Sequence, residues 1–137
     1  MSGPRYAELQ ATSHFSFLRG ASSCEELFSQ AALAGIEAVA VCDHNTVAGI
    51  VRAHEAAKVT RVRLIVGCRL DLTDGTGILV YPLDRAGYGR LCRLLSLGKT
   101  RAGKGACKID WADLAHYGTV DRDSCLADSL QEGAHEF

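Results

Sequence analysis

The chain has 137 residues, a formal charge of -1 at neutral pH, and 47% hydrophobic against 23% charged residues. This length supports one domain with a buried core, and the balance is typical of a soluble globular protein rather than a disordered one. A charge so close to zero excludes a global attraction to nucleic acid, so any such contact must come from a local patch.

The first predicted strand covers Tyr6 to Thr12, and an irregular loop follows through Gly20. A helix comes next, because Ser23 is a suitable N-cap and Glu26, three residues later, completes a capping box. Gly35 is a typical stop signal for this helix.

The second predicted strand, residues 36–42, is almost unbroken in its apolar character, which indicates burial on both faces as in a parallel sheet. A helix over about Val47 to Ala57 follows. It is predicted from a stripe of residues at spacings i, i+3, i+4 and i+7: Val47, Ile50, Val51 and His54. The stripe places His54 at the edge of the core.

Residues 62–68 form a third predicted buried strand, and residues 69–82 read as a hairpin around a Thr-Asp-Gly-Thr turn. Asp84 is a suitable cap for a helix that ends near Gly98. The apolar residues of this helix share one side: Tyr88, Leu91, Leu94 and Leu95.

Residues 98–108 predict a mobile basic loop, because they combine three glycines with four cations. The cations are Lys99, Arg101, Lys104 and Lys108. These cations could contact nucleic-acid phosphates, and a solvated surface loop is the alternative. Residues 110–117 predict a short helix capped by Asp110. Periodicity is lost afterwards, so we expect a folded domain over residues 1–117 and a polar, weakly ordered tail over 118–137.

Strands that alternate with helices favour an α/β architecture with a mostly parallel sheet, either a small open sheet or part of a βα barrel. Asp43 and His44 follow the second predicted strand. The carboxyl ends of such strands are where α/β folds keep their chemistry, so this pair indicates a candidate metal or acid/base site.

The six cysteines are scattered without a C-x-x-C pair, which excludes a zinc ribbon and a disulfide scaffold. We expect reduced thiols in an intracellular chain, with Cys42 and Cys68 acting as small hydrophobes inside apolar runs. The first residues, MSGPRYAELQ, lack a signal-peptide profile, and no stretch approaches the ~20 apolar residues that span a bilayer. A cytoplasmic location without a membrane partner is therefore expected.

Five segments, taken in order, resemble the N-terminal PHP (polymerase and histidinol phosphatase) domain of bacterial C-family DNA polymerases. Within that family they most resemble the error-prone members, which are related to the replicative alpha subunit. The segments are YAELQATSHFSFLRGAS, CDHNTVAGIVRAHEAAK, RLIVGCRLDL, ILVYPLDRAGYGRLCRLLSLGKTRAGKG and DWADLAHY. The resemblance implies part of a distorted βα barrel of the PHP type, with mostly parallel strands and one hairpin. It also implies a metal site at the strand carboxyl ends.

The chain departs from the pattern of active PHP members at four positions. Their first strand carries His-x-His, and the aligned residues here are Gln10 and Thr12. Arg19 stands where a loop carboxylate is expected, and Arg69 where a bridging glutamate is expected. A guanidinium stays protonated in proteins and therefore disfavours a cluster of several cations.

Three residues remain as candidate metal ligands. His44 matches the histidine of the family's Asp-His motif, Asp43 keeps its place beside it, and His14 could substitute from a shifted position in the loop. We interpret these residues as a vestigial metal site in which Asp43 orients His44. Zn or Mn is not expected to be held, and Mg is expected only for the polymerase domain, which these residues do not contain.

The resemblance thus implies the PHP portion of an error-prone DNA polymerase, which performs translesion synthesis and DNA repair. The palm carboxylates that add nucleotides are absent, so this chain is expected to be structural and inactive by itself. Its expected partners are the remaining polymerase domains, DNA and other translesion factors, and the isolated piece is expected to self-associate. A stand-alone metal-dependent phosphoesterase of the same superfamily and an unrelated α/β interaction module are the alternatives.

Overall fold

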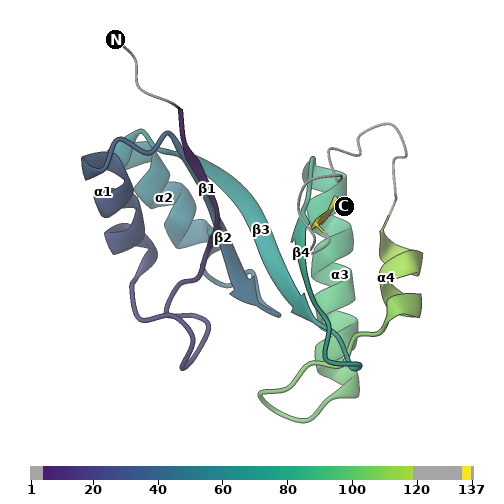
Figure 1. The fold of residues 1–137 in the computed structure, drawn as a ribbon. Coiled ribbons are helices and arrows are strands. Elements are labelled where there is room, and N and C mark those ends of the chain that lie inside the picture. Colours follow the sequence, from purple (N-terminus) through teal and green to yellow (C-terminus); the bar gives the residue numbers. More distant parts are fainter. Residues whose placement is uncertain (1–4, 119–133, 137) are drawn as a thin grey trace. The chain divides into compact units, whose positions relative to one another are not determined.

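The computed structural model describes residues 5–118 and 134–136 and shows helices alternating with strands (Figure 1). The chain divides into two compact units, Met1–Cys68 and Arg69–Phe137. Strands neighbour one another in the order β1-β2-β3-β4-β5, and β3 crosses the boundary between the units. The predicted α/β class with one hairpin is confirmed.

The first unit contains β1 (Ala7–Ala11), α1 (Cys24–Leu33), β2 (Ala38–His44), α2 (Ile50–Thr60) and most of β3 (Arg63–Asp71). β1 runs parallel to β2, with a register irregularity just before the end of β1. Both helices lie on the same side of these two strands (Figure 1). This parallel pairing brings the loops that follow β1 and β2 to the same end of the sheet.

The core of the first unit lies between the two helices and the strands. Ser23 and Glu26 form the predicted capping box, which positions α1 so that Phe28 is fully buried. The buried residues of this core come from α1, β2, α2 and the position just before β3: Cys24, Phe28, Ala31, Val39, Val41, Ile50, Ala53, Ala56 and Val62.

The predicted helical stripe of the second helix is wrong in part. α2 begins at Ile50 rather than Val47, and its buried side is formed by Ile50, Ala53 and Ala56. Val51 is 71% exposed, and His54 is exposed rather than at the core edge. Small alanines let the helix approach the sheet closely. Two of the three buried residues are therefore alanines, which are less hydrophobic than the exposed Val51 and harder to recognise as core residues from the sequence.

The second unit contains the end of β3, β4 (Gly77–Tyr81), α3 (Arg85–Arg101), α4 (Trp111–Tyr117) and the short β5 (Ala134–Glu136), which pairs parallel with β4. The predicted hairpin turn is present, and Leu72 N–H donates to the Thr76 carbonyl across it. The third strand and the first arm of the hairpin are one continuous strand, β3.

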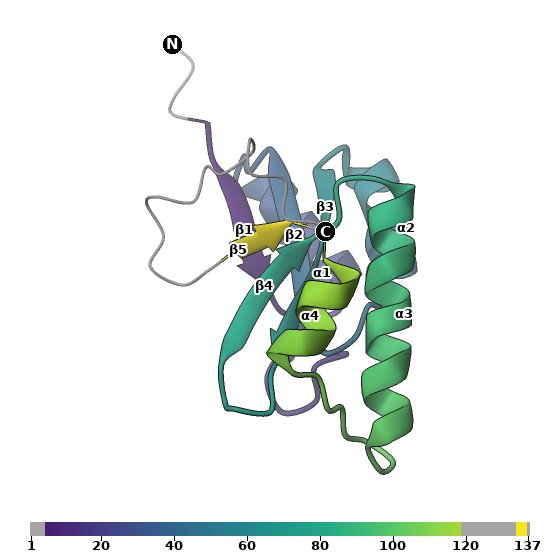
Figure 2. The same ribbon diagram turned by 90° about the vertical axis from the view of Figure 1, so that its right-hand side faces the viewer.

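Helix α3 begins at the predicted cap, since the Asp84 side chain accepts from Gly87 N–H. Leu91, Leu94 and Leu95 are buried on one side, as predicted. The helix continues past the expected stop at Gly98 and ends at Arg101. Figure 2 shows α4 beside α3, where the predicted Asp110 cap forms a capping box with Asp113.

The expectation for residues 118–137 falls mostly outside the described residues, apart from Gly118 and the three residues of β5. Among the helices that the structure describes, none has the length and apolar character required to cross a membrane.

Candidate functional site

The loop after β1 is fastened to the end of β2 by one carboxylate. Asp43 is 2% exposed, and its Oδ1 accepts hydrogen bonds from Ser13 N–H at 2.8 Å and from Ser16 Oγ at 2.8 Å. Its Oδ2 accepts from Ser13 Oγ at 2.7 Å. Hydrogen bonds to a charged acceptor are roughly twice as strong as neutral ones, so this carboxylate is the anchor of the loop.

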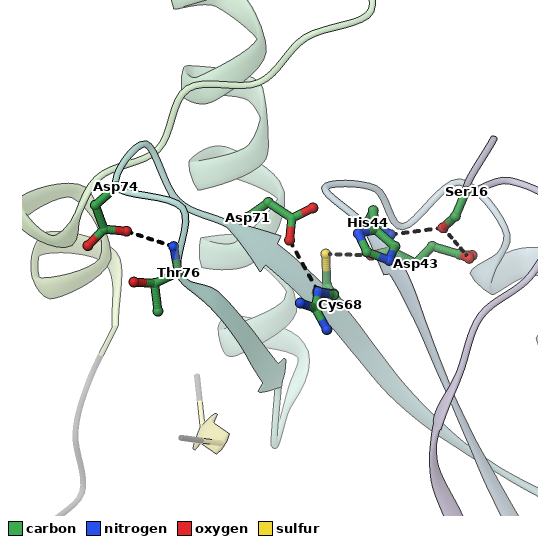
Figure 3. A network of polar contacts seen from close by, with 8 residues as sticks. Ser16, Asp43, His44, Cys68, Asp71, Asp74 and Thr76 are labelled. Atoms are coloured by element: carbon green, nitrogen blue, oxygen red, sulfur yellow. Dashed lines mark hydrogen bonds and ion pairs between the residues drawn. The ribbon is translucent and has the colours of Figure 1, made fainter. Parts of the chain in front are cut away.

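The loop closes on itself around Ser16. His44 N–H donates to Ser16 Oγ at 2.9 Å, which ties the last residue of β2 to the same serine (Figure 3). Gly20 N–H and Arg19 N–H both donate to the Ser16 carbonyl. A Cβ at Gly20 would overlap the Ser13 carbonyl, so this close return of the chain requires glycine.

The space behind Asp43 is filled by packed groups. The Cys68 Sγ donates to the Asp43 carbonyl at 3.4 Å, and the Cys24 Sγ donates to the Gly49 carbonyl at 3.4 Å. A Cβ at Gly49 would lie 2.9 Å from a ring carbon of Phe15 and 3.3 Å from Asp43 Oδ2. Burial raises the pKa of the Cys24 thiol, and a hydrogen bond with Ser13 only partly offsets this effect.

The tip of the loop points apolar side chains into solvent. Phe17 is 84% exposed and Leu18 is 89% exposed, and Leu18 has a left-handed backbone with φ of 62°. His14 is exposed too, with its ring 4.7 Å from the ring of Phe15. The rigid base of the loop therefore supports an exposed, partly aromatic tip.

The candidate metal residues have different surroundings. Asp43 is buried and bonded to the two serines, His44 is half-buried at the end of β2, and His14 is exposed in the loop. No group of three His, Cys, Asp or Glu residues suited to a metal ion occurs within 5–118 and 134–136. The interpretation that Asp43 orients the His44 imidazole needs correction, because the carboxylate hydrogen bonds end on Ser13 and Ser16.

The four departures from the PHP ligand pattern lie in both units. Gln10 is exposed in β1, Thr12 is half-buried just after it, and Arg19 is exposed in the loop. In the second unit, the Nε of Arg69 lies 3.1 Å from Asp71 Oδ1 in an ion pair. A Cβ at Gly77 would overlap the Arg69 guanidinium, so Arg69 occupies the space across the hairpin.

Ser13 and Ser16 are the residues that sequence reasoning missed. The signal was present as two serines three residues apart before a glycine, a spacing in which serine side chains organise turns. Their partner is 30 positions away for Ser13 and 27 for Ser16, so no local pattern identifies Asp43 as that partner.

The predicted mobile basic loop over residues 98–108 is also corrected in part. Gly98 lies within α3, and Lys108 N–H donates to its carbonyl at 2.9 Å. The returning segment packs so closely that a Cβ at Gly98 would lie 2.6 Å from both Cys107 Sγ and Ile109 Cγ1. The segment after α3 is therefore docked against this helix rather than detached from it.

The four candidate nucleic-acid residues of this segment are not equivalent. Lys99, Lys104 and Lys108 are exposed. Arg101 instead binds Asp113 of α4, with 2.6 Å between Nη1 and Oδ2. The Arg101 guanidinium thus holds α4 against the end of α3.

We expect the Arg101–Asp113 pair to make stability depend on pH. Burial acts to raise the Asp113 pKa, but the Asp110 N–H and the Arg101 guanidinium outweigh it and hold the pKa below its usual value. The stabilisation is therefore present above the unfolded-state pKa of about 3.9 and is lost as pH falls through the lower folded-state pKa. Asp113→Asn is expected to cost about 1 kcal/mol at neutral pH and to flatten this dependence. Urea unfolding followed by Trp111 fluorescence at pH 7 and pH 3 measures both effects, and an unchanged pH dependence would contradict them.

Comparison with curated proteins finds several polymerases similar to this chain. Error-prone DNA polymerase 1 of Agrobacterium fabrum is 66% identical over 118 residues, which is 86% of this chain and 11% of that protein. The error-prone DNA polymerase of Caulobacter vibrioides is 53% identical over 138 residues, which is 96% of this chain and 13% of that protein. The chain thus spans little more than a tenth of the length of these relatives.

Two solved structures share the fold. A protein from Bifidobacterium adolescentis, assigned as a metal-dependent phosphoesterase, has a TM-score of 0.58 at 21% identity and covers 70% of this chain and 34% of its own. An amidohydrolase from Chromobacterium violaceum, solved with bound sulfate and no metal, has a TM-score of 0.57 at 23% identity and covers 67% of this chain and 32% of its own.

The parallel strands, with a polar loop anchored at a strand carboxyl end, define an α/β domain of the class that places its functional residues at that end of the sheet. The model of one such family, the PHP domain, matches residues 8–128. The chain belongs to the PHP domain family.

Proposed function

We propose that this chain is the PHP portion of an error-prone DNA polymerase and that it serves there as a structural part rather than as a hydrolase. Its likeness to error-prone DNA polymerases, with 66% identity to one of them, supports the parent activity. Translesion synthesis, DNA repair, a cytoplasmic location and contact with other translesion factors belong to this proposal. So do DNA and the remaining polymerase domains as partners, and self-association of the isolated chain.

The single observation that carries the structural role is the use of the Asp43 carboxylate. All three of its hydrogen bonds hold the loop after β1, and the carboxylate is buried by Ser13 and Ser16. A buried carboxylate that accepts three short hydrogen bonds stabilises the fold and cannot also bind a metal ion without releasing the loop. The carboxyl end of β2 therefore holds the loop after β1 in place in this chain.

The residues present do not fit a centre of several metal ions. Such a centre activates water and clamps phosphate oxygens with at least two well-held cations. Here the positions that correspond to ligands in active PHP members hold Gln10, Thr12, Arg19 and Arg69. Two are neutral side chains and two are permanent cations, so the charge at these positions opposes further cations.

The first test is metal content by elemental analysis after incubation with Zn and Mn, combined with hydrolysis of a generic phosphomonoester. We expect less than about 0.2 equivalents of metal per chain, because a lone imidazole holds no ion tightly. The phosphoesterase alternative would replace our proposal if two or more ions stayed bound and turnover disappeared in His44→Ala.

A second test asks whether the chain performs the structural role. Residues 8–118 would replace the matching segment of the Agrobacterium fabrum polymerase, and primer extension would be measured. We expect extension within about threefold of the parent, a change below 1 kcal/mol in activation free energy, for the graft and for the graft with His44→Ala. Loss of extension in a correctly folded graft would contradict the proposal.

A further inference from the structure

The segment from Arg85 to Lys108 concentrates positive charge in a chain that is nearly neutral. Over these 24 residues there is no Asp or Glu, although the whole chain has 15 basic and 16 acidic residues. Seven of the 15 basic residues lie here: Arg85, Arg90, Arg93, Lys99, Arg101, Lys104 and Lys108. The remainder of the chain is therefore strongly acidic, and this segment is a local exception.

Helix α3 turns part of this charge to solvent. Its buried side is formed by Leu91, Leu94 and Leu95. At 100° per residue, Arg85 and Arg93 fall on the side of the helix opposite these leucines, and Lys99 falls at the border of that side. All three side chains are exposed. The residues between them on this side are small and uncharged: Gly89, Ser96 and Thr100.

The aspartates of residues 69–118 are occupied elsewhere. Each accepts a hydrogen bond in a turn, a helix cap or a side-chain pair: Asp71 from Arg69, Asp74 from Thr76 and Trp111, Asp84 from Gly87, Asp110 from Asp113, and Asp113 from Arg101 and Asp110. Arg101 is paired with Asp113. The segment has five other exposed cations, and among the described residues none of them takes part in an ion pair: Arg85, Arg93, Lys99, Lys104 and Lys108. Their charge is therefore available to an external anion.

We propose that the outer face of α3, with the docked segment after it, binds the sugar-phosphate backbone of nucleic acid without reading its sequence. Arg85 and Lys99 are 14 residues apart on the helix, about 21 Å, which matches roughly six phosphates of one strand. Arg101 is excluded from this surface, because it is the structural partner of Asp113. The exposed face has no aromatic side chain, so it contacts phosphates and does not stack on bases.

This proposal goes beyond a structural role and rests on the proposed function only for the choice of DNA as the nucleic acid. Its experiment is separate from the graft, because it measures binding by the chain itself. Fluorescence anisotropy of a labelled 20-base-pair duplex and of a 20-nucleotide oligo-dT would be recorded from 50 to 200 mM salt.

The test variant carries Arg85→Gln, Arg93→Gln and Lys99→Gln together. Its matched control carries Arg52→Gln, Lys58→Gln and Arg63→Gln, three exposed cations of the first unit, so both lose three positive charges. We expect the test variant to bind duplex at least tenfold more weakly at 50 mM salt, and its slope of log K against log salt to be shallower by about 2 to 3. The control is expected to bind within about twofold of the parent chain, since its cations make no phosphate contact.

Three outcomes would overturn the proposal. Equal weakening in the control would show that net charge alone drives binding, and unchanged binding in the test variant would remove α3 from the surface. Binding to phosphatidylserine vesicles through the same three residues, without binding to DNA, would make this face a membrane contact. If Trp111 fluorescence shows that the test variant is unfolded, Lys104→Gln with Lys108→Gln provides a second variant with the same expected direction.

Discussion

Asp43→Ala is expected to lower the free energy of unfolding of the first unit by about 3 to 5 kcal/mol. The change removes the acceptor of three hydrogen bonds and leaves the Ser13 N–H buried without a partner. Ser16, which also holds the His44 N–H, would lose its fixed position at the same time. The loop after β1 should then separate from the end of β2.

Urea unfolding followed by far-ultraviolet circular dichroism measures this effect. His44→Ala is the matched control, because it alters the adjacent residue and leaves the carboxylate in place, and we expect it to cost less than about 1 kcal/mol. Asp43→Asn should lie between the two, since an amide keeps one acceptor oxygen and directs a donor at a serine hydroxyl. If His44→Ala proved as costly as Asp43→Ala, the carboxylate would not be the anchor of the loop.

Gly98→Ala and Gly89→Ala are expected to change the stability of the second unit in opposite directions, although both add one methyl group to α3. At Gly98 the new Cβ would lie 2.6 Å from Cys107 Sγ and from Ile109 Cγ1, and such overpacking typically costs about 1 to 3 kcal/mol. At Gly89 a Cβ meets nothing within 4 Å. Alanine there should stabilise the helix by about 0.5 to 1 kcal/mol through its higher helix propensity.

Trp111 fluorescence is the appropriate signal for this pair, because it is the single tryptophan and lies in α4 of the same unit. The docked segment would have to move to accommodate Gly98→Ala, and α4 follows that segment directly. Equal stabilisation by both alanines would show that the segment after α3 is detached, as the sequence alone suggested.

Local signals account for the parts of the fold that were predicted. The Ser23–Glu26 capping box and the Asp84 and Asp110 caps depend on residues three positions apart, and all were predicted from the sequence. The hairpin turn around Asp74 is similarly local. Because these contacts lie within a few residues, their chemistry is visible in the sequence itself.

Contacts between distant residues account for the errors. Gly98 is a typical helix stop, yet α3 continues because residues 107–109 pack on it and donate a hydrogen bond to its carbonyl. His54 fits an apolar stripe by spacing, whereas the sheet selects the alanine face of α2. In the candidate site the position of Asp43 at a strand end was predicted, but its serine partners were not.

The buried thiols of the first unit make its opening measurable on its own. Cys24, Cys42 and Cys68 are buried, and each Sγ donates to a backbone carbonyl. An alkylating reagent can reach them only when the unit opens, so the rate of the slow labelling phase reports that opening. Tryptophan fluorescence reports the other unit, because Trp111 lies there. Thiol labelling and Trp111 fluorescence thus report the two units separately. Comparing the two rates would reveal whether the units unfold together or one at a time.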